Sequence, residues 1–349
     1  DYLGSDTINN LYFYQAVDGT PMEKSIYQVD GKGKMTKIST RKGLCTAVFN
    51  SGRNLFIQTA SDLNSPPVIC VCNLKGKELR TITDNAELKN KLGEVKVAQK
   101  TFFKVPAADG TLLNGWMLKP FGFDEKAKYP VIQIQYSGPD NQMVLDKYNF
   151  DWEYYLAENG FIVVCVDGRG TGGRGYDFRR STFKNLGQLE SKDQIAVSKY
   201  LKSLSYVDGG RIGIWGWSFG GFITLMSMTD SESIFKAGIA VAPVCDYRYY
   251  NTVYTERFMR TPGQNKEGYD AGSPLMRAGS LKGNLLLVHG LEDDNVRANQ
   301  SIDFVEELIK SGIQFDTQFY PTSSHSILGI TYRKHLYRKM ADFFIDKLK

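Results

Sequence analysis

Residues 212–221 read Ile-Gly-Ile-Trp-Gly-Trp-Ser-Phe-Gly-Gly, and this stretch decides the fold. Residues 212–215 predict a buried strand, and the segment Ser218–Met228 predicts a helix. Between them, residues 216–220 match the G-x-S-x-G pattern of a nucleophile elbow, in which a strained turn projects the serine hydroxyl above a sheet. We therefore interpret Ser218 as a nucleophile; the alternative is a serine that only caps an ordinary helix.

Strands and helices alternate along the chain on both sides of this motif. Apolar runs predict strands over Val131–Gln135, Ile162–Val166, Ile212–Trp215, Ala237–Val241 and Asn284–Val288. Amphipathic patterns predict helices over Glu190–Leu204, Ser218–Met228, Ser301–Ser311 and Arg333–Leu348. This alternation is typical of a mostly parallel, doubly wound sheet with helices on both faces, and together with the elbow it predicts the α/β-hydrolase fold.

The beginning of the chain follows a different pattern. Short apolar runs such as Leu11–Tyr14 and Asn54–Gln58 are separated by turn signals, and the pattern passes through two similar cycles. Short, evenly spaced strands are typical of β-propeller blades, of which a propeller needs at least about four. We therefore expect residues 1–85 to be the C-terminal part of a propeller, residues 86–349 to be the catalytic domain, and the chain to be the C-terminal part of a larger protein.

The composition excludes several classes of function. The 349 residues carry a net charge of +5, which is spread along the chain without the basic clusters that nucleic-acid binding needs. No apolar run is long enough to span a membrane. The five cysteines match neither a disulfide framework nor a zinc site. We expect no metal and no cofactor.

The general base can be sought among only three histidines. His325 lies in a polar loop after an expected strand, Phe315–Tyr320, where this fold places its base. His289 ends an earlier strand and is expected to support the loop that follows it. His335 lies in a charged helix and is expected at the surface. We therefore predict that His325 is the base.

The remaining catalytic groups are less sharply defined by the residues alone. The acid should lie between the serine and the histidine, and the run Glu292-Asp293-Asp294 does, but spacing does not separate Asp293 from Asp294. The backbone N–H of Phe219 should donate to the oxyanion because it follows the nucleophile. Tyr136, in the loop after the strand at Val131, is the candidate for a second donor; the alternative is a packing tyrosine.

Several motifs resemble the prolyl oligopeptidase family, and specifically its dipeptidyl peptidase IV branch. They are Gly216–Gly221, Asp167–Gly172, Tyr136–Pro139, Ala242–Val244 with Val253–Arg257, and His289–Val296. The resemblance implies that Asp293 is the acid of the triad and that Tyr136 donates its hydroxyl to the oxyanion. It implies that Asn295 holds the carbonyl of the residue before proline. The proline pocket that it implies, with flat aromatic walls suited to a pyrrolidine ring, is formed by Val244, Tyr247, Tyr250, Tyr254 and Val296.

On this resemblance we expect a serine exopeptidase that releases N-terminal X-Pro or X-Ala dipeptides from peptide substrates through an acyl-enzyme. The alternatives are a prolyl tripeptidyl peptidase, an acylaminoacyl peptidase, a catalytically inactive scaffold and an inactive fragment. The paired glutamates that hold the substrate amine in this branch would lie upstream of Asp1. The resemblance further implies a homodimer and a periplasmic or extracytoplasmic location.

Overall fold

The computed structural model describes residues 1–95 and 97–349, which divide into two compact units. The first unit consists of Asp1–Thr101 and Val144–Asp151, and the second of Phe102–Met143 and Trp152–Lys349. The short segment Val144–Asp151 lies inside the predicted catalytic part of the sequence and yet belongs, by its contacts, to the first unit.

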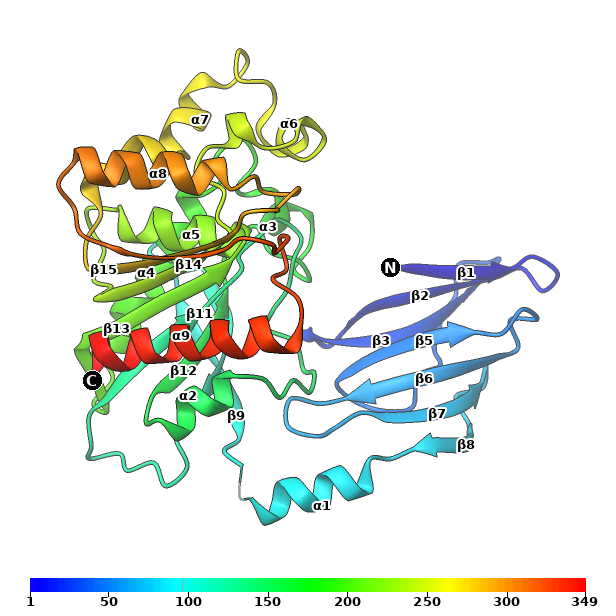
Figure 1. The fold of residues 1–349 in the computed structure, drawn as a ribbon. Helices are drawn as coiled ribbons and strands as arrows, with labels where there is room; N and C mark the ends of the chain where they lie inside the picture. The colour runs from blue at the N-terminus through cyan, green and yellow to red at the C-terminus, as the bar shows by residue number, and fades with distance from the viewer. Residues whose placement is uncertain (96) are drawn as a thin grey trace. The chain divides into compact units, whose positions relative to one another are not determined.

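The first unit is a sheet of two four-stranded antiparallel meanders (Figure 1). The strands of the first meander are β1 (Tyr2–Asp6), β2 (Leu11–Asp18), β3 (Thr20–Asp30) and β4 (Met35–Lys37). Those of the second are β5 (Leu44–Phe49), β6 (Leu55–Ser61), β7 (Val68–Asn73) and β8 (Glu78–Thr83), and helix α1 (Ala86–Glu94) follows them. A single parallel pair, Lys24 with Leu44, joins the meanders. The two meanders correspond to the two cycles of short strands read from the sequence and confirm the propeller-like segment.

The segment Val144–Asp151 is bound into this sheet through Asp146. The N–H of Asp146 donates to the carbonyl of Met22 (2.9 Å), and its own carbonyl accepts from the N–H of Leu44 (2.8 Å). Its side-chain Oδ1 accepts from the N–H of Leu63 (2.7 Å). Three strands or strand ends of the first unit therefore share this one residue as a hydrogen-bond partner.

The second unit is an eight-stranded mixed sheet with helices on both faces. Its strands lie in the order β16 (Asp316–Tyr320), β15 (Asn284–Gly290), β14 (Ala237–Val241), β13 (Val207–Trp217), β11 (Tyr129–Ile134), β12 (Ile162–Asp167), β10 (Leu112–Leu118) and β9 (Lys100–Pro106). The helices are α2 (Glu153–Glu158), α3 (Tyr176–Arg180), α4 (Gln188–Ser203), α5 (Phe219–Met228), α6 (Thr252–Met259), α7 (Lys266–Ala271), α8 (Asn299–Lys310) and α9 (Ile330–Leu348), with the 3₁₀ turns η1 (Tyr247–Tyr249) and η2 (Leu275–Ser280). This architecture confirms the predicted α/β-hydrolase fold.

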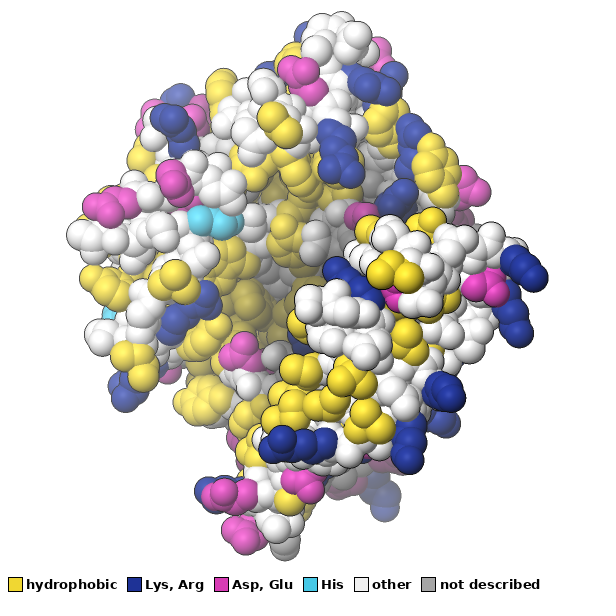
Figure 2. Space-filling view, turned by 90° about the vertical axis from the view of Figure 1, so that its right-hand side faces the viewer, with side chains coloured by type: hydrophobic (Ala, Val, Ile, Leu, Met, Phe, Trp, Pro, Cys, Tyr) yellow, Lys and Arg dark blue, Asp and Glu magenta, His cyan; other side chains and the backbone are white. Residues whose placement is uncertain are grey.

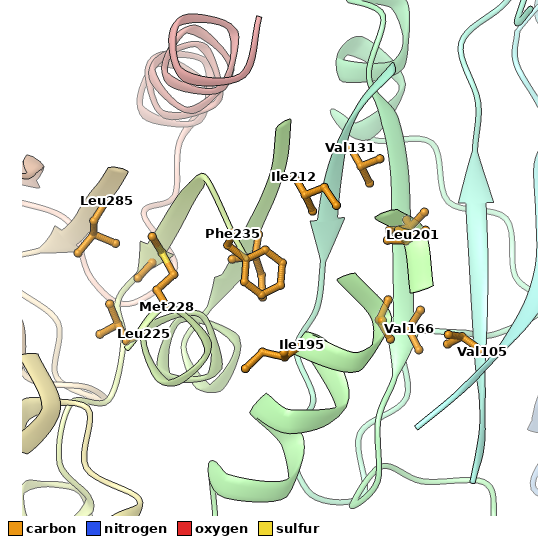
Figure 3. Close-up of a cluster of buried hydrophobic side chains, with 14 of the residues drawn as sticks. Val105, Val131, Val166, Ile195, Leu201, Ile212, Leu225, Met228, Phe235 and Leu285 are labelled. Atoms are coloured by element: carbon orange, nitrogen blue, oxygen red, sulfur yellow. The ribbon is translucent and has the colours of Figure 1, made fainter. Parts of the chain in front are cut away.

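The central strand β13 shows why both faces are covered. Alternate side chains of a strand point to opposite faces, and Ile212 packs in one cluster with Leu225 of α5 and Ile195 of α4 (Figure 3). Gly213 faces the other way, where an added Cβ would lie 2.8 Å from a methyl carbon of Leu348 in α9. The lack of a side chain at this glycine therefore lets α9 pack closely on β13.

The parallel part of the sheet brings the predicted site residues to one edge. Strands β11 to β16 run parallel to one another, so their carboxyl ends lie at the same edge. Tyr136, Ser218, Asp293 and His325 follow the ends of β11, β13, β15 and β16. Open α/β sheets bind their ligands at this edge.

Candidate active site

Ser218 occupies the turn between β13 and α5. Its backbone has φ 60° and ψ −117°, a strained conformation that persists only where the surrounding structure holds it. The N–H of Ser218 donates to the carbonyl of Val241 in β14 (2.8 Å). A Cβ at Gly220 would lie 2.5 Å from the carbonyl oxygen of Gln135, and one at Gly216 would overlap the carbonyl of Gly220. The flanking glycines are therefore a steric requirement of this elbow.

His325 and Asp293 form the short contact expected of a base and its orienting acid. The distance from His325 Nδ1 to Asp293 Oδ2 is 2.6 Å, which leaves Nε2 of the imidazole as the atom that can take a proton. The indole N–H of Trp217, next to the nucleophile, donates to the backbone carbonyl of His325 (3.0 Å). Asp293 is buried whereas Asp294 is exposed, so the structure distinguishes two residues that spacing could not.

Three further groups hold the Asp293 carboxylate. Oδ1 accepts the backbone N–H groups of Asn295 and Val296, both at 2.9 Å. His289 Nε2 lies 3.2 Å from Oδ2 and 2.8 Å from the carbonyl of Val296, and because both neighbours are acceptors this nitrogen acts as the donor. Burial would raise the pKa of Asp293, but the hydrogen bonds from His289 and His325 outweigh it and hold this pKa well below its usual value. Asp293 is therefore ionised at neutral pH.

Tyr136 follows the end of β11, close enough to the Ser218 side chain for that side chain to affect its pKa. Burial and the neighbouring Tyr250 raise the pKa of Tyr136, so its hydroxyl keeps its proton and can donate. Gln135, the residue before it, donates from Nε2 to the carbonyl of Gly220 (2.7 Å) and so ties this loop to the start of α5. Phe219 begins α5, where the N–H groups of the first turn lack helical partners.

The six residues predicted to bind substrate come together next to the elbow. Val244, Tyr247 and Val296 are buried in one cluster, and Tyr250 and Tyr254 pack against it. The rings of Tyr250 and Tyr254 meet edge to face, with centroids 5.6 Å apart and an interplanar angle of 82°. The sixth residue, Asn295, accepts a hydrogen bond from the Tyr250 hydroxyl at Oδ1 (2.9 Å).

Glu190, in the first turn of α4, is a carboxylic acid buried in the protein interior. It is completely buried, and its Oε2 accepts the N–H of Gly187 (2.9 Å). Burial raises the pKa of Glu190 to about 8, and the charge of Asp193 acts in the same direction against several hydrogen bonds. Burial raises the pKa of Tyr247 and of Tyr254, two tyrosines of the aromatic pocket, and the charge of Glu190 acts in the same direction.

A metal-binding group, a disulfide and a membrane-spanning helix are absent from residues 1–95 and 97–349. These residues contain no group of three or more histidine, cysteine or acidic side chains that could hold a metal ion. All five cysteines are buried and none forms a disulfide. No helix within these ranges has the length and apolar character needed to cross a membrane.

Comparison with known sequences decides the family. A sequence profile described as the prolyl oligopeptidase family matches residues 148–349, which include the elbow, the acid and the histidine. The chain belongs to the prolyl oligopeptidase family. A second profile, described as the dipeptidyl peptidase IV N-terminal region, matches residues 1–67, in the two meanders. This member of the family of serine peptidases is thus of the dipeptidyl peptidase IV type, as its motifs predicted.

Individual relatives agree with this placement. A crystal structure of Porphyromonas gingivalis dipeptidyl peptidase 4 superposes with a TM-score of 0.97 and 46% identity, over 99% of this chain and 49% of that one. Proteins named "Probable dipeptidyl-aminopeptidase B" are 37% identical in Pyrenophora teres f. teres and 35% identical in Aspergillus terreus, each over 98% of this chain. The chain spans 38% of the length of these two curated relatives.

Some residues that position the site carried no signal in the sequence. Gln135 and Trp217 each make a long-range hydrogen bond that positions the site, and neither has a stated role in a motif. Ser301, near the start of α8, forms a hydrogen bond between its Oγ and His289 Nδ1 (2.7 Å). A polar side chain next to a motif can mark a residue that positions a site. The sequence could not identify the partners of Gln135 and Trp217, because these partners lie 85 or more residues away.

Proposed function

We propose that this chain carries the catalytic machinery of a serine exopeptidase that releases N-terminal X-Pro or X-Ala dipeptides. The observation that carries the proposal is the 2.6 Å contact between His325 and Asp293, at the same sheet edge as the strained Ser218 elbow. The aromatic pocket beside the elbow supports a preference for a small ring at the residue before the cleaved bond. The similarity to dipeptidyl peptidases supports release of two residues at a time.

The mechanism follows from the positions of these groups. Ser218 Oγ attacks the carbonyl carbon of the scissile bond while His325 Nε2 takes its proton. Asp293 keeps the imidazole in the right tautomer and stabilises the imidazolium that forms. The N–H of Phe219 and the hydroxyl of Tyr136 donate to the oxyanion. His325 then gives its proton to the leaving amine, and the acyl group stays on Ser218 until a water, activated by the same histidine, releases it.

Covalent labelling tests the nucleophile independently of the substrate. A fluorophosphonate probe should attach to the chain, because the reagent needs only an activated serine. Ser218→Ala should abolish the labelling, whereas His335→Ala, which removes a histidine of α9 outside the triad, should leave it intact. Labelling that persists in Ser218→Ala would sink the assignment.

Cleavage of three peptide anilides tests how many residues the enzyme releases from the substrate N-terminus. The test uses the longer protein that also carries the amine-binding segment expected upstream of Asp1. We expect release from Gly-Pro, little release from Ala-Ala-Pro, and none from acetyl-Gly-Pro, because dipeptide release requires a free amine two residues from the bond. A preference for Ala-Ala-Pro, or indifference to acetylation, would retain the serine mechanism and overturn dipeptide release.

A further inference from the structure

Four arginines surround a hollow in the second unit that the mechanism does not use. Its volume is about 230 Å³, and it is lined by Arg179, Arg180, Arg257 and Arg260 together with Asp140 and the rings of Phe183 and Phe258. We call it the arginine pocket. Arginine and lysine side chains gather in the upper right part of the face shown in Figure 2. All four arginines of the pocket belong to the second unit.

The arginine pocket is short of negative charge. Arg179 pairs with the Asp140 carboxylate (3.2 Å). Across the described part of the chain, no carboxylate lies within ion-pair distance of Arg180, Arg257 or Arg260. With one carboxylate among four guanidinium groups, the hollow has a net positive charge that favours an anion. Aromatic rings help to hold them there: Arg180 lies 4.5 Å and Arg260 lies 5.2 Å from the centre of the Phe183 ring.

The backbone of Arg260 is strained, which is a second and independent observation. Its φ of 64° and ψ of −172° lie in a region that only glycine adopts easily. Two hydrogen bonds hold it: its N–H donates to the Glu256 carbonyl (3.0 Å), and its carbonyl accepts from the Tyr269 hydroxyl (2.6 Å). A charged side chain at a position suited to glycine suggests that the guanidinium group itself is needed.

The arginine pocket adjoins the aromatic cluster beside the elbow through one shared neighbour, Phe258. Asp140 lies four residues after Tyr136 in the same loop, and Phe258 lies four residues after Tyr254 on α6. The ring centroids of Phe258 and Tyr254 are 4.8 Å apart, so a side chain that lines the arginine pocket packs directly against a side chain of the predicted proline pocket. An anion in the arginine pocket can therefore be part of a peptide bound at Ser218.

We propose that the arginine pocket binds the carboxylate of an Asp or Glu side chain of the peptide substrate. The planar guanidinium group matches a carboxylate through paired hydrogen bonds, and Arg179 already pairs with the carboxylate of Asp140. The inference rests on the proposed function, because the ligand is a substrate of that peptidase. It adds a preference for acidic peptides to the preference for proline.

Peptide binding to the Ser218→Ala chain tests the proposal without hydrolysis. The ligands are fluorescent pentapeptides with proline at position two. They form four pairs, and the two peptides of a pair differ only in having Glu or Gln at position one, three, four or five. We expect one Glu peptide to bind about tenfold more tightly than its Gln twin, a difference of ~1.4 kcal/mol. The preference should shrink with added salt, because the guanidinium groups are open to solvent.

Two variants and one control identify the residues responsible. Arg179→Gln and Arg260→Gly should each reduce the preference, and glycine at position 260 also relieves the strained backbone, so misfolding does not explain the loss. Arg338→Gln, which removes an exposed arginine of α9, should leave the preference unchanged. Equal binding of every Glu and Gln pair, or a preference that survives both variants, overturns the proposal. Glutarate that competes as well as the Glu peptide would mean a free anion site and overturns it too.

The labelling experiment on Ser218 separates this inference from the peptidase proposal. If the fluorophosphonate labels Ser218 and the paired peptides bind alike, the peptidase stands and the acidic subsite falls. If the Glu preference depends on the arginines and Ser218 is not labelled, the subsite stands as an anion site and the peptidase proposal falls.

Discussion

Replacing Glu190 by glutamine should change the stability of the second unit in a way that depends on pH. Its raised pKa of about 8 means that the folded chain keeps a proton on Glu190 that the unfolded chain loses near the ordinary value of 4.5. Stability from this group is therefore fully present below about pH 4.5 and is lost as the pH rises toward 8. The slope is about 1.4 kcal/mol per pH unit while only the folded chain holds the proton.

The glutamine of the Glu190→Gln variant would have no such proton to lose, and its amide oxygen can still accept the N–H of Gly187. The free energy of unfolding of Glu190→Gln relative to wild type should thus increase by about 3 kcal/mol between about pH 5 and pH 7.5. Urea titration followed by tryptophan fluorescence measures it, because all four tryptophans lie in the second unit. Glu158→Gln, at an exposed site on α2, is the control. A difference that stays flat with pH, or that falls, refutes the reasoning.

Three further changes test the site. Asp293→Asn should lower kcat by about 10⁴-fold because an amide cannot hold the tautomer of its histidine; Asp294→Asn should leave kcat nearly unchanged, and equal losses in initial-rate assays would contradict the assignment. Tyr136→Phe should lower kcat by about 10²–10³-fold with little change in KM; an unaltered kcat would remove Tyr136 from the oxyanion site. Gly220→Ala should destabilise the second unit by about 1–3 kcal/mol in urea titrations, since its Cβ would lie 2.5 Å from a carbonyl oxygen; Gly263→Ala, where a Cβ meets nothing within 4 Å, should not.

The fold could be predicted because its signals are local. The strand predicted over Ala237–Val241 agrees with β14 at both ends, and the helix predicted over Ser218–Met228 begins one residue early relative to α5. The strand predicted over Ile212–Trp215 is longer in the structure because β13 starts at Val207. The N-terminal extension of β13 includes Asp208-Gly-Gly210, a turn-like run that masks the strand pattern.

The candidate site was predictable only in part, because its finer choices depend on contacts between distant segments. Histidine elimination singled out His325, whereas spacing left both Asp293 and Asp294 open. The family resemblance implied Asp293, and its burial and 2.6 Å contact with His325 are visible only in the structure. The sequence pattern also predicted no helix at α6, which carries Tyr254. Its eight residues are too few for a clear amphipathic period, and the cap that Asn251 provides to the N–H of Tyr254 is visible only in space. The homodimer and the extracytoplasmic location stay predictions.

The segment Val144–Asp151 has a consequence for how such proteins can be cut and recombined. The chain leaves the first unit after Thr101, returns to it for these eight residues, and leaves it again. A shortened chain that begins at Phe102 would retain Asp146 but lose Met22, Leu44 and Leu63, to which Asp146 is hydrogen-bonded. A chimaera that takes residues 1–101 from one relative must therefore take the returning segment from the same parent. The unit that can be exchanged between relatives therefore consists of two separate segments of the sequence.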